Sequence, residues 1–285
     1  MRGIRGLRPT ILWGLLALLL VGCGASQAPP HSVAVGATSS TESVLLANLY
    51  AAALRYYGTP AHVVELADPL RALDSGEVTV VPGFTGRLLQ TFAPGTRAAG
   101  DEQVYKAMVG VLPEGVGAGD FATAAEDKPA AVVTEGTATA WGGRDLPVLV
   151  KHCAQVRAGA LRDAVVPAAV GKCRLAPPRE FGSSAELFDA LADGQINVAW
   201  ATTADPGVPS TVVVLADGKP PLIQAQNAVP LYRRNELTAR QVLAVNEVAG
   251  VLDTATLKQM RAQVDDGADP RAVADAWLVE NPLGR

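Results

Sequence analysis

The chain has 285 residues, of which 24 are basic and 28 acidic, so its formal net charge at pH 7 is −4. This balance argues against a nucleic-acid-binding protein, which would carry a basic surface. The length suits one large domain or two small ones. Only 5% of the residues are aromatic, so alanine, valine and leucine must fill the core, and every aromatic side chain in a cleft gains importance.

Residues 1–22 are predicted to be a lipoprotein signal peptide. Three arginines precede an apolar run from Ile11 to Val21, which is about half the ~20 residues that a membrane-spanning helix needs. The run ends in Leu20-Val21-Gly22-Cys23. Cleavage would leave Cys23 for lipidation, and acyl chains would anchor the protein to the extracytoplasmic face of the cell membrane through a tether over residues 23–32. The mature chain would carry 21 basic and 28 acidic residues, a net charge of −7.

The mature chain begins with a predicted strand over residues 32–36, followed by a helix that runs to Tyr57 and ends at Gly58. Ser39-Ser40-Thr41-Glu42 is typical of a capping box at the start of this helix. The free N–H groups there, together with the hydroxyls of Ser39, Ser40 and Thr41, could bind a carboxylate or another anion. Plain N-capping is the alternative.

Two segments that lie 118 positions apart repeat one pattern. Residues 70–86 and 188–204 each predict an amphipathic helix, a glycine, an apolar strand and a polar loop. Ligands of open α/β sheets bind beyond the carboxyl ends of the strands, so Phe84-Thr85 and Thr202-Thr203 are expected to face one site from two lobes. The alternative is that helix, glycine and strand follow one another in many α/β proteins.

The rest of the chain predicts a second lobe and a helical tail. Gly115 to Gly119 is expected to be a flexible loop before a strand that contains Phe121, and it lacks the strand–glycine–helix order of a dinucleotide fingerprint. A strand over residues 228–232 would return to the first lobe. We expect lobe 1 to comprise residues 33–117 and 230–285, lobe 2 to comprise residues 118–229, and the two crossings near Phe121 and Val229 to act as hinges.

Two cysteines remain in the mature chain. An exported protein meets an oxidising compartment, so Cys153 and Cys173 are predicted to form a disulfide. A metal site is the weaker interpretation, because His152 is a direct neighbour of Cys153 and points away from it on a helix or strand. We expect no cofactor and no metal.

The sequence does not indicate an enzyme. Nucleophile-elbow, zinc-protease and phosphate-loop motifs are missing, and the chain has three histidines, one of them in the tether. Asp205 is a lone carboxylate in the predicted cleft. It could bind a ligand hydroxyl or amine, or it could cap a turn before Pro206.

Several short motifs occur in an order and spacing that resemble one family, the osmoprotectant-binding lipoproteins of ABC importers, which take up glycine betaine, choline, carnitine and relatives. The likeness covers nearly the whole mature chain. The matching motifs are Gly36-Ala37-Thr38-Ser39-Ser40-Thr41-Glu42, Ser75-Gly76-Glu77, Gly83-Phe84-Thr85-Gly86, Leu112-Pro113, Phe121-Ala122, Ala204-Asp205, Gln226-Asn227-Ala228-Val229-Pro230 and residues 273–278.

The resemblance implies a two-lobed α/β periplasmic-binding-protein fold of type II, in which helices flank a mostly parallel sheet in each lobe. Aromatic rings in that family box a quaternary ammonium, and the matching positions here are Phe84, Phe121, Thr202 and Gln226. Two rings are therefore replaced by a hydroxyl and an amide, which bind through hydrogen bonds.

Two further side chains bear on the ligand. Arg87 could supply a cation for a ligand carboxylate, or it could be solvated on a helix; Trp200 could replace a lost ring or pack in the core. We expect a monomeric lipoprotein that closes around a small polar solute, other than betaine itself, and presents it to an ABC permease. The alternative is a surface lipoprotein of the same fold that acts as a sensor or interaction partner without transport.

Overall fold

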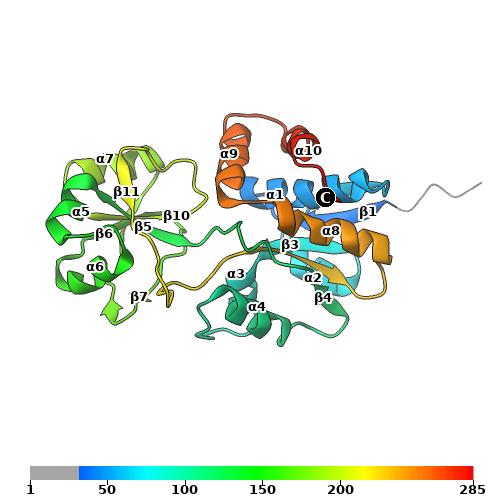
Figure 1. Ribbon diagram of the computed structural model, residues 1–285, viewed down its shortest axis with the longest axis horizontal. Helices are drawn as coiled ribbons and strands as arrows, with labels where there is room; N and C mark the ends of the chain where they lie inside the picture. Colours follow the sequence, from blue (N-terminus) through cyan, green and yellow to red (C-terminus); the bar gives the residue numbers. More distant parts are fainter. Residues whose placement is uncertain (1–31, 285) are drawn as a thin grey trace, which may run out of the picture. The chain divides into compact units, whose positions relative to one another are not determined.

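The computed structural model describes residues 32–284 (Figure 1). They contain two five-stranded sheets and one two-stranded hairpin. The predicted signal peptide over residues 1–22, the lipidation site Cys23 and the tether up to residue 31 lie outside the described residues. Within the described part, no helix has the length and apolar character needed to cross a bilayer.

Lobe 1 is the part of the chain built on the first sheet, whose strand order is β2-β1-β3-β12-β4. Four strands run in one direction, and β12 is antiparallel to both of its neighbours. The strands are β1 (Val33–Ala37), β2 (Ala61–Glu65), β3 (Val80–Phe84), β4 (Val116–Ala118) and β12 (Ala228–Arg233).

Helices cover both faces of this sheet. Side chains of α1, α8, α9 and α10 form one core with β1, and side chains of α2, α3 and α4 form the other with β12. Helix α1 is buried on all sides from Leu45 to Leu54, which explains its continuous apolar sequence. The helices are α1 (Thr41–Tyr56), α2 (Pro69–Ser75), α3 (Thr85–Phe92), α4 (Asp101–Val109), α8 (Ala239–Val251), α9 (Thr254–Asp265) and α10 (Pro270–Glu280).

Lobe 2 is built on the second sheet, whose strand order is β11-β5-β10-β6-β9. Here β5 is the strand that runs against the other four. The strands are β5 (Pro129–Thr134), β6 (Ala158–Leu161), β9 (Arg179–Phe181), β10 (Val198–Thr202) and β11 (Val212–Val214). The helices are α5 (Glu135–Trp141), α6 (Leu146–Lys151), the 3-10 turn η1 (Cys153–Gln155) and α7 (Ser184–Ala192).

The chain passes between the two sheets twice. The first crossing, residues 119–128, joins β4 to β5, and the second, residues 215–227, joins β11 to β12. Each crossing therefore leads into the one reversed strand of the sheet that it enters. The expected loop over residues 115–119 is wrong in part, because Val116–Ala118 pairs with β12 as the edge strand β4. Phe121 lies in the crossing and not in a strand.

Helix ends follow the local sequence signals with one exception. Gly76 and Gly194 have φ values of 81° and 69°, so both repeats leave their helix through a left-handed glycine. The predicted capping box at residues 39–42 is wrong. The N-cap of α1 is Ser40, whose hydroxyl accepts a hydrogen bond from Ser43 N, and the Glu42 side chain pairs with Arg87 instead.

The predicted disulfide is confirmed. Cys153 and Cys173 are bonded, with their Cα atoms 5.5 Å apart and a sequence separation of 20 residues. Cys173 belongs to the hairpin of β7 (Ala169–Val170) and β8 (Cys173–Arg174) and is buried in the lobe 2 core. The bond therefore ties this hairpin to the end of α6.

Replacing both cysteines by serine should lower the free energy of unfolding by about 3 kcal/mol, because the closed loop no longer restricts the unfolded chain. Urea unfolding of the two proteins measures this difference. Dithiothreitol should destabilise the wild type by a similar amount and leave the double variant unchanged. Equal unfolding midpoints for the wild type and the double variant would contradict this role of the bond.

Candidate functional site

A cavity of about 290 Å³ is lined by residues of both lobes and of both crossings. We call it the interlobe cavity. Its size lies at the lower end of the range of roughly 300–1,000 Å³ that is usual for small-molecule sites. Its charged lining residues are Glu42, Arg87, Asp127, Asp163, Asp205 and Arg261.

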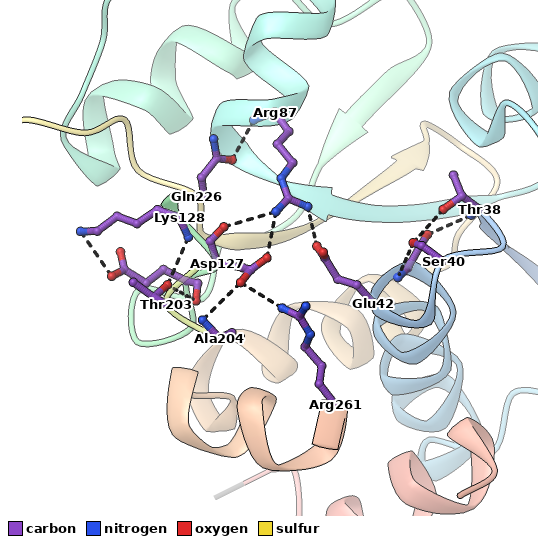
Figure 2. Close-up of polar contacts among 12 residues, drawn as sticks. Thr38, Ser40, Glu42, Arg87, Asp127, Lys128, Thr203, Ala204, Gln226 and Arg261 are labelled. Carbon is purple, nitrogen blue, oxygen red and sulfur yellow. Dashed lines mark hydrogen bonds and ion pairs between the residues drawn. The ribbon is translucent and has the colours of Figure 1, made fainter. Parts of the chain in front are cut away.

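The Asp127 carboxylate is the centre of an ion-pair network at this cavity (Figure 2). Its side chain has no solvent exposure and pairs with Arg87 Nη2 at 2.8 Å and with Arg261 Nη1 at 3.0 Å. Ala204 N of lobe 2 donates to the same carboxylate at 3.2 Å. A buried carboxylate is tolerated only when charges and hydrogen bonds compensate for its lost hydration. Asp127 therefore links α3 and α9 of lobe 1, through the first crossing, to the chain just after β10.

Arg87 contacts three other segments of the chain, two through its side chain and one through its backbone (Figure 2). Besides Asp127, its guanidinium binds Glu42 Oε1 at 2.5 Å, and its backbone N–H donates to Gln226 Oε1 at 2.8 Å. Burial acts against the charged form, but the carboxylates of Glu42 and Asp127 outweigh it and raise the pKa of Arg87. Arg87 lies on α3, as its second interpretation expected, and its side chain is 38% exposed, but its guanidinium is held by two carboxylates.

Burial and the neighbouring Arg87 also shift the pKa of Glu42 in opposite directions. Burial raises the pKa of the Glu42 carboxyl, and the neighbouring Arg87 guanidinium offsets only part of this shift. Glu42 forms an ion pair with one guanidinium, that of Arg87, whereas Asp127 has two guanidinium partners.

Neither of the two predicted ring positions, Phe84 and Phe121, lines the interlobe cavity. Phe84 is 3% exposed and belongs to the lobe 1 core, and the Arg87 guanidinium lies 4.8 Å from its ring centroid. Phe121 packs against Tyr105 with a centroid distance of 4.7 Å, within the other core of lobe 1. Arg87 therefore covers part of the Phe84 ring, and Tyr105 covers part of the Phe121 ring. These parts of the two rings are not available to a ligand.

Trp200 packs in the hydrophobic core of lobe 2 and also lines the interlobe cavity. Its side chain is 2% exposed and packs in the lobe 2 core. Its indole N–H has no acceptor among residues 32–284, and the same holds for the buried hydroxyl of Thr202 on the same strand. Both residues line the interlobe cavity.

The predicted site residues differ in whether they line the interlobe cavity, a second cavity or neither of the two. Thr202, Asp205, Gln226, Arg87 and Trp200 line the interlobe cavity. Phe84, Ser40 and Arg87 line a second cavity of about 360 Å³ at the carboxyl end of β3 and the start of α1. Ser39, Thr41, Thr85, Phe121 and Thr203 line neither of the two.

Thr85 and Thr203 hold the crossings in place. The Thr85 hydroxyl accepts from Asn227 N, and the Thr203 hydroxyl accepts from Lys128 N and donates to Glu126 O. Asp205 caps its own turn, since one carboxylate oxygen accepts from Gly207 N at 2.7 Å. The turn interpretation of Asp205 is therefore correct, and the same side chain also faces the cavity.

Sequence reasoning missed Asp127, Arg261 and Asp163, none of which lies in a recognisable motif. It placed Glu42 in a motif but gave the side chain no role at the site. Among the described residues, no group of three or more acids, histidines or cysteines is arranged to hold a metal ion.

The Asp127→Asn variant should unfold with a free energy about 3 kcal/mol lower than that of the wild type, because two guanidiniums lose their shared anion. Chemical denaturation measures the difference. Asp193→Asn is the matched control: this exposed carboxylate ends α7 outside the network, and its loss should change stability by less than about 0.5 kcal/mol. Equal losses in the two variants would mean that the network does not stabilise the fold.

Comparison with solved structures shows the same fold. Apo YehZ from Escherichia coli superposes with a TM-score of 0.68 at 21% identity, covering 88% of this chain and 99% of that one. A structure described as a glycine betaine/carnitine/choline ABC transporter gives a TM-score of 0.72 at 18% identity, with 88% and 98% covered. A choline binding protein of an ABC transporter in complex with choline gives 0.58 at 14% identity, with 88% and 89% covered.

A comparison with curated proteins finds no match. The family model described as the substrate binding domain of ABC-type glycine betaine transport systems matches residues 31–280. This match spans both lobes and both crossings, and the type II two-lobed fold agrees with it. The chain therefore belongs to the OpuAC family of non-enzymatic, ABC-type substrate-binding proteins.

Proposed function

We propose that this protein is an extracytoplasmic lipoprotein that binds a small polar solute and delivers it to an ABC permease. The observation that carries the proposal is the interlobe cavity, because charged and polar side chains from both lobes and both crossings meet there. Membership of the OpuAC family supports the same role. The N-terminal sequence around Cys23 supports the lipid anchor.

The proposed mechanism is hinge closure of a monomer. Residues 33–117 and 230–285 would move against residues 118–229, with the dihedral changes absorbed in the crossings. A solute that contacts both lobes stabilises the closed state, and the permease would recognise that state.

The proposed solute is held by hydrogen bonds and charge rather than by an aromatic cage. Neighbouring structures are described as binding choline. Here Arg87 covers the Phe84 ring, and Phe121 is packed on Tyr105. Each ring face that a quaternary ammonium loses is worth about 0.5–2 kcal/mol, so we propose a ligand other than betaine.

The purified full chain should be stabilised in a thermal-shift panel of amines, amino acids, polyols and sugars, because a ligand at about 100 times its dissociation constant adds about 2.7 kcal/mol. Small-angle scattering of the stabilised complex should show compaction. Cells that lack the protein should lose uptake of the same solute and recover it with the wild type.

The control variant for this experiment is Thr202→Val combined with Gln226→Leu, which removes two polar groups of the interlobe cavity. It should fail to restore uptake. Stabilisation without compaction would argue against closure. An intact uptake phenotype, with no solute that stabilises the protein, would instead favour the sensor or interaction role.

A further inference from the structure

The interlobe cavity carries more negative than positive charge. Four carboxylates and two guanidiniums line it. Arg87 is paired with Glu42 and Asp127, and Arg261 is paired with Asp127. Asp163 and Asp205 take part in no ion pair within residues 32–284. Arg87 and Arg261 thus neutralise Glu42 and Asp127. The other two carboxylates, Asp163 and Asp205 of lobe 2, have no counter-charge within residues 32–284.

Asp205 is the better placed of these two carboxylates. It directly follows Ala204, whose N–H binds the buried Asp127 carboxylate. Its own turn uses one oxygen, which accepts from Gly207 N at 2.7 Å. The turn also fixes the position of the side chain, and its other oxygen keeps its full capacity to accept hydrogen bonds. Asp163 stands in an exposed loop with a left-handed φ of 63° at the edge of the same cavity.

The uncharged groups of the cavity add a second requirement. The Trp200 indole N–H can only donate, and Thr202 carries a hydroxyl; neither has a partner in the described chain. Trp200 is 98% buried, since its exposed fraction is 2%. A buried donor without an acceptor is costly. An oxygen on the solute would satisfy it.

We propose, on the basis of the function proposed above, that the interlobe cavity binds a small solute that combines an N–H-bearing cation, a primary ammonium or a guanidinium, with a neutral oxygen acceptor. Asp205 is its principal counter-ion. A carboxylate binds such a cation through charge-assisted hydrogen bonds, which are about twice as strong as neutral ones. A trimethylammonium group has no N–H to donate and needs free ring faces, and Arg87 already occupies that of Phe84.

Successive N-methylation of one compound tests this inference. Ethanolamine, N-methylethanolamine, N,N-dimethylethanolamine and choline share a hydroxyl and a positive charge but differ in the number of N–H donors. Calorimetric titration of the full chain should give the tightest binding for ethanolamine and at least tenfold weaker binding for choline. Agmatine, which carries N–H-bearing cations but no oxygen, should bind more weakly than ethanolamine.

Matched variants locate the counter-ion. Asp205→Asn keeps an oxygen that can accept from Gly207 N, so the turn and the unfolding midpoint should be unchanged, while ethanolamine affinity falls at least tenfold. Asp193→Asn, on an exposed helix end of the same lobe, should bind as the wild type does. If Asp205→Asn lowered both the affinity and the unfolding midpoint, Asp205→Glu would be measured in its place. This variant keeps the charge and should bind ethanolamine more tightly than Asp205→Asn does.

The outcomes separate the inference from the function on which it rests. Choline binding as tight as ethanolamine binding, or stabilisation by polyols alone, overturns the inference and leaves the transport proposal standing. An Asp205→Asn variant that binds ethanolamine normally also overturns it. A chain that binds no compound of the thermal-shift panel, in cells with normal uptake, overturns both.

Discussion

A single buried carboxylate, that of Asp127, sets the arrangement of this site. Its full burial would carry a penalty of several kcal/mol without compensation. Arg87, Arg261 and the N–H of Ala204 supply the compensation. These groups come from α3, from α9 and from the segment after β10. The conformation of the first crossing therefore depends on contacts with both lobes. The charge pattern of the cavity follows from this requirement.

Arg87 is the side chain on which the proposed preference for an N–H-bearing cation depends most. The guanidinium that satisfies Asp127 and Glu42 also lies over the ring of Phe84. A cation of the protein therefore takes the place on this ring that a ligand cation would need. The remaining acids of the cavity, Asp163 and Asp205, lie on lobe 2 and are the carboxylates that a cationic solute would bind under our proposal. The ion pairs of the site and the proposed ligand selectivity thus both involve Arg87.

Local patterns in the sequence were sufficient for the two lobes, the glycine-terminated helices and the disulfide. Gly76 and Gly194 mark helix ends because the left-handed backbone there needs a residue without a Cβ atom. The network was not predictable in the same way, since Arg87 and Arg261 lie 40 and 134 positions from Asp127. The glycines at residues 115–119 misled for a related reason: β12, more than 100 positions later, makes Val116–Ala118 a strand. Glu42 satisfies the local rule for a capping residue, but the tertiary ion pair with Arg87 prevails.

A double-mutant cycle between Asp127 and Arg87 tests the central interaction most directly. The free energy of unfolding is measured for the wild type, Asp127→Ala, Arg87→Ala and the double variant. We expect a coupling energy of about 1–3 kcal/mol, because each single substitution leaves a charge that has lost one of its two ionic partners. Losses that add to within about 0.5 kcal/mol would show that the two side chains are energetically independent. The shared buried carboxylate would then not organise the site.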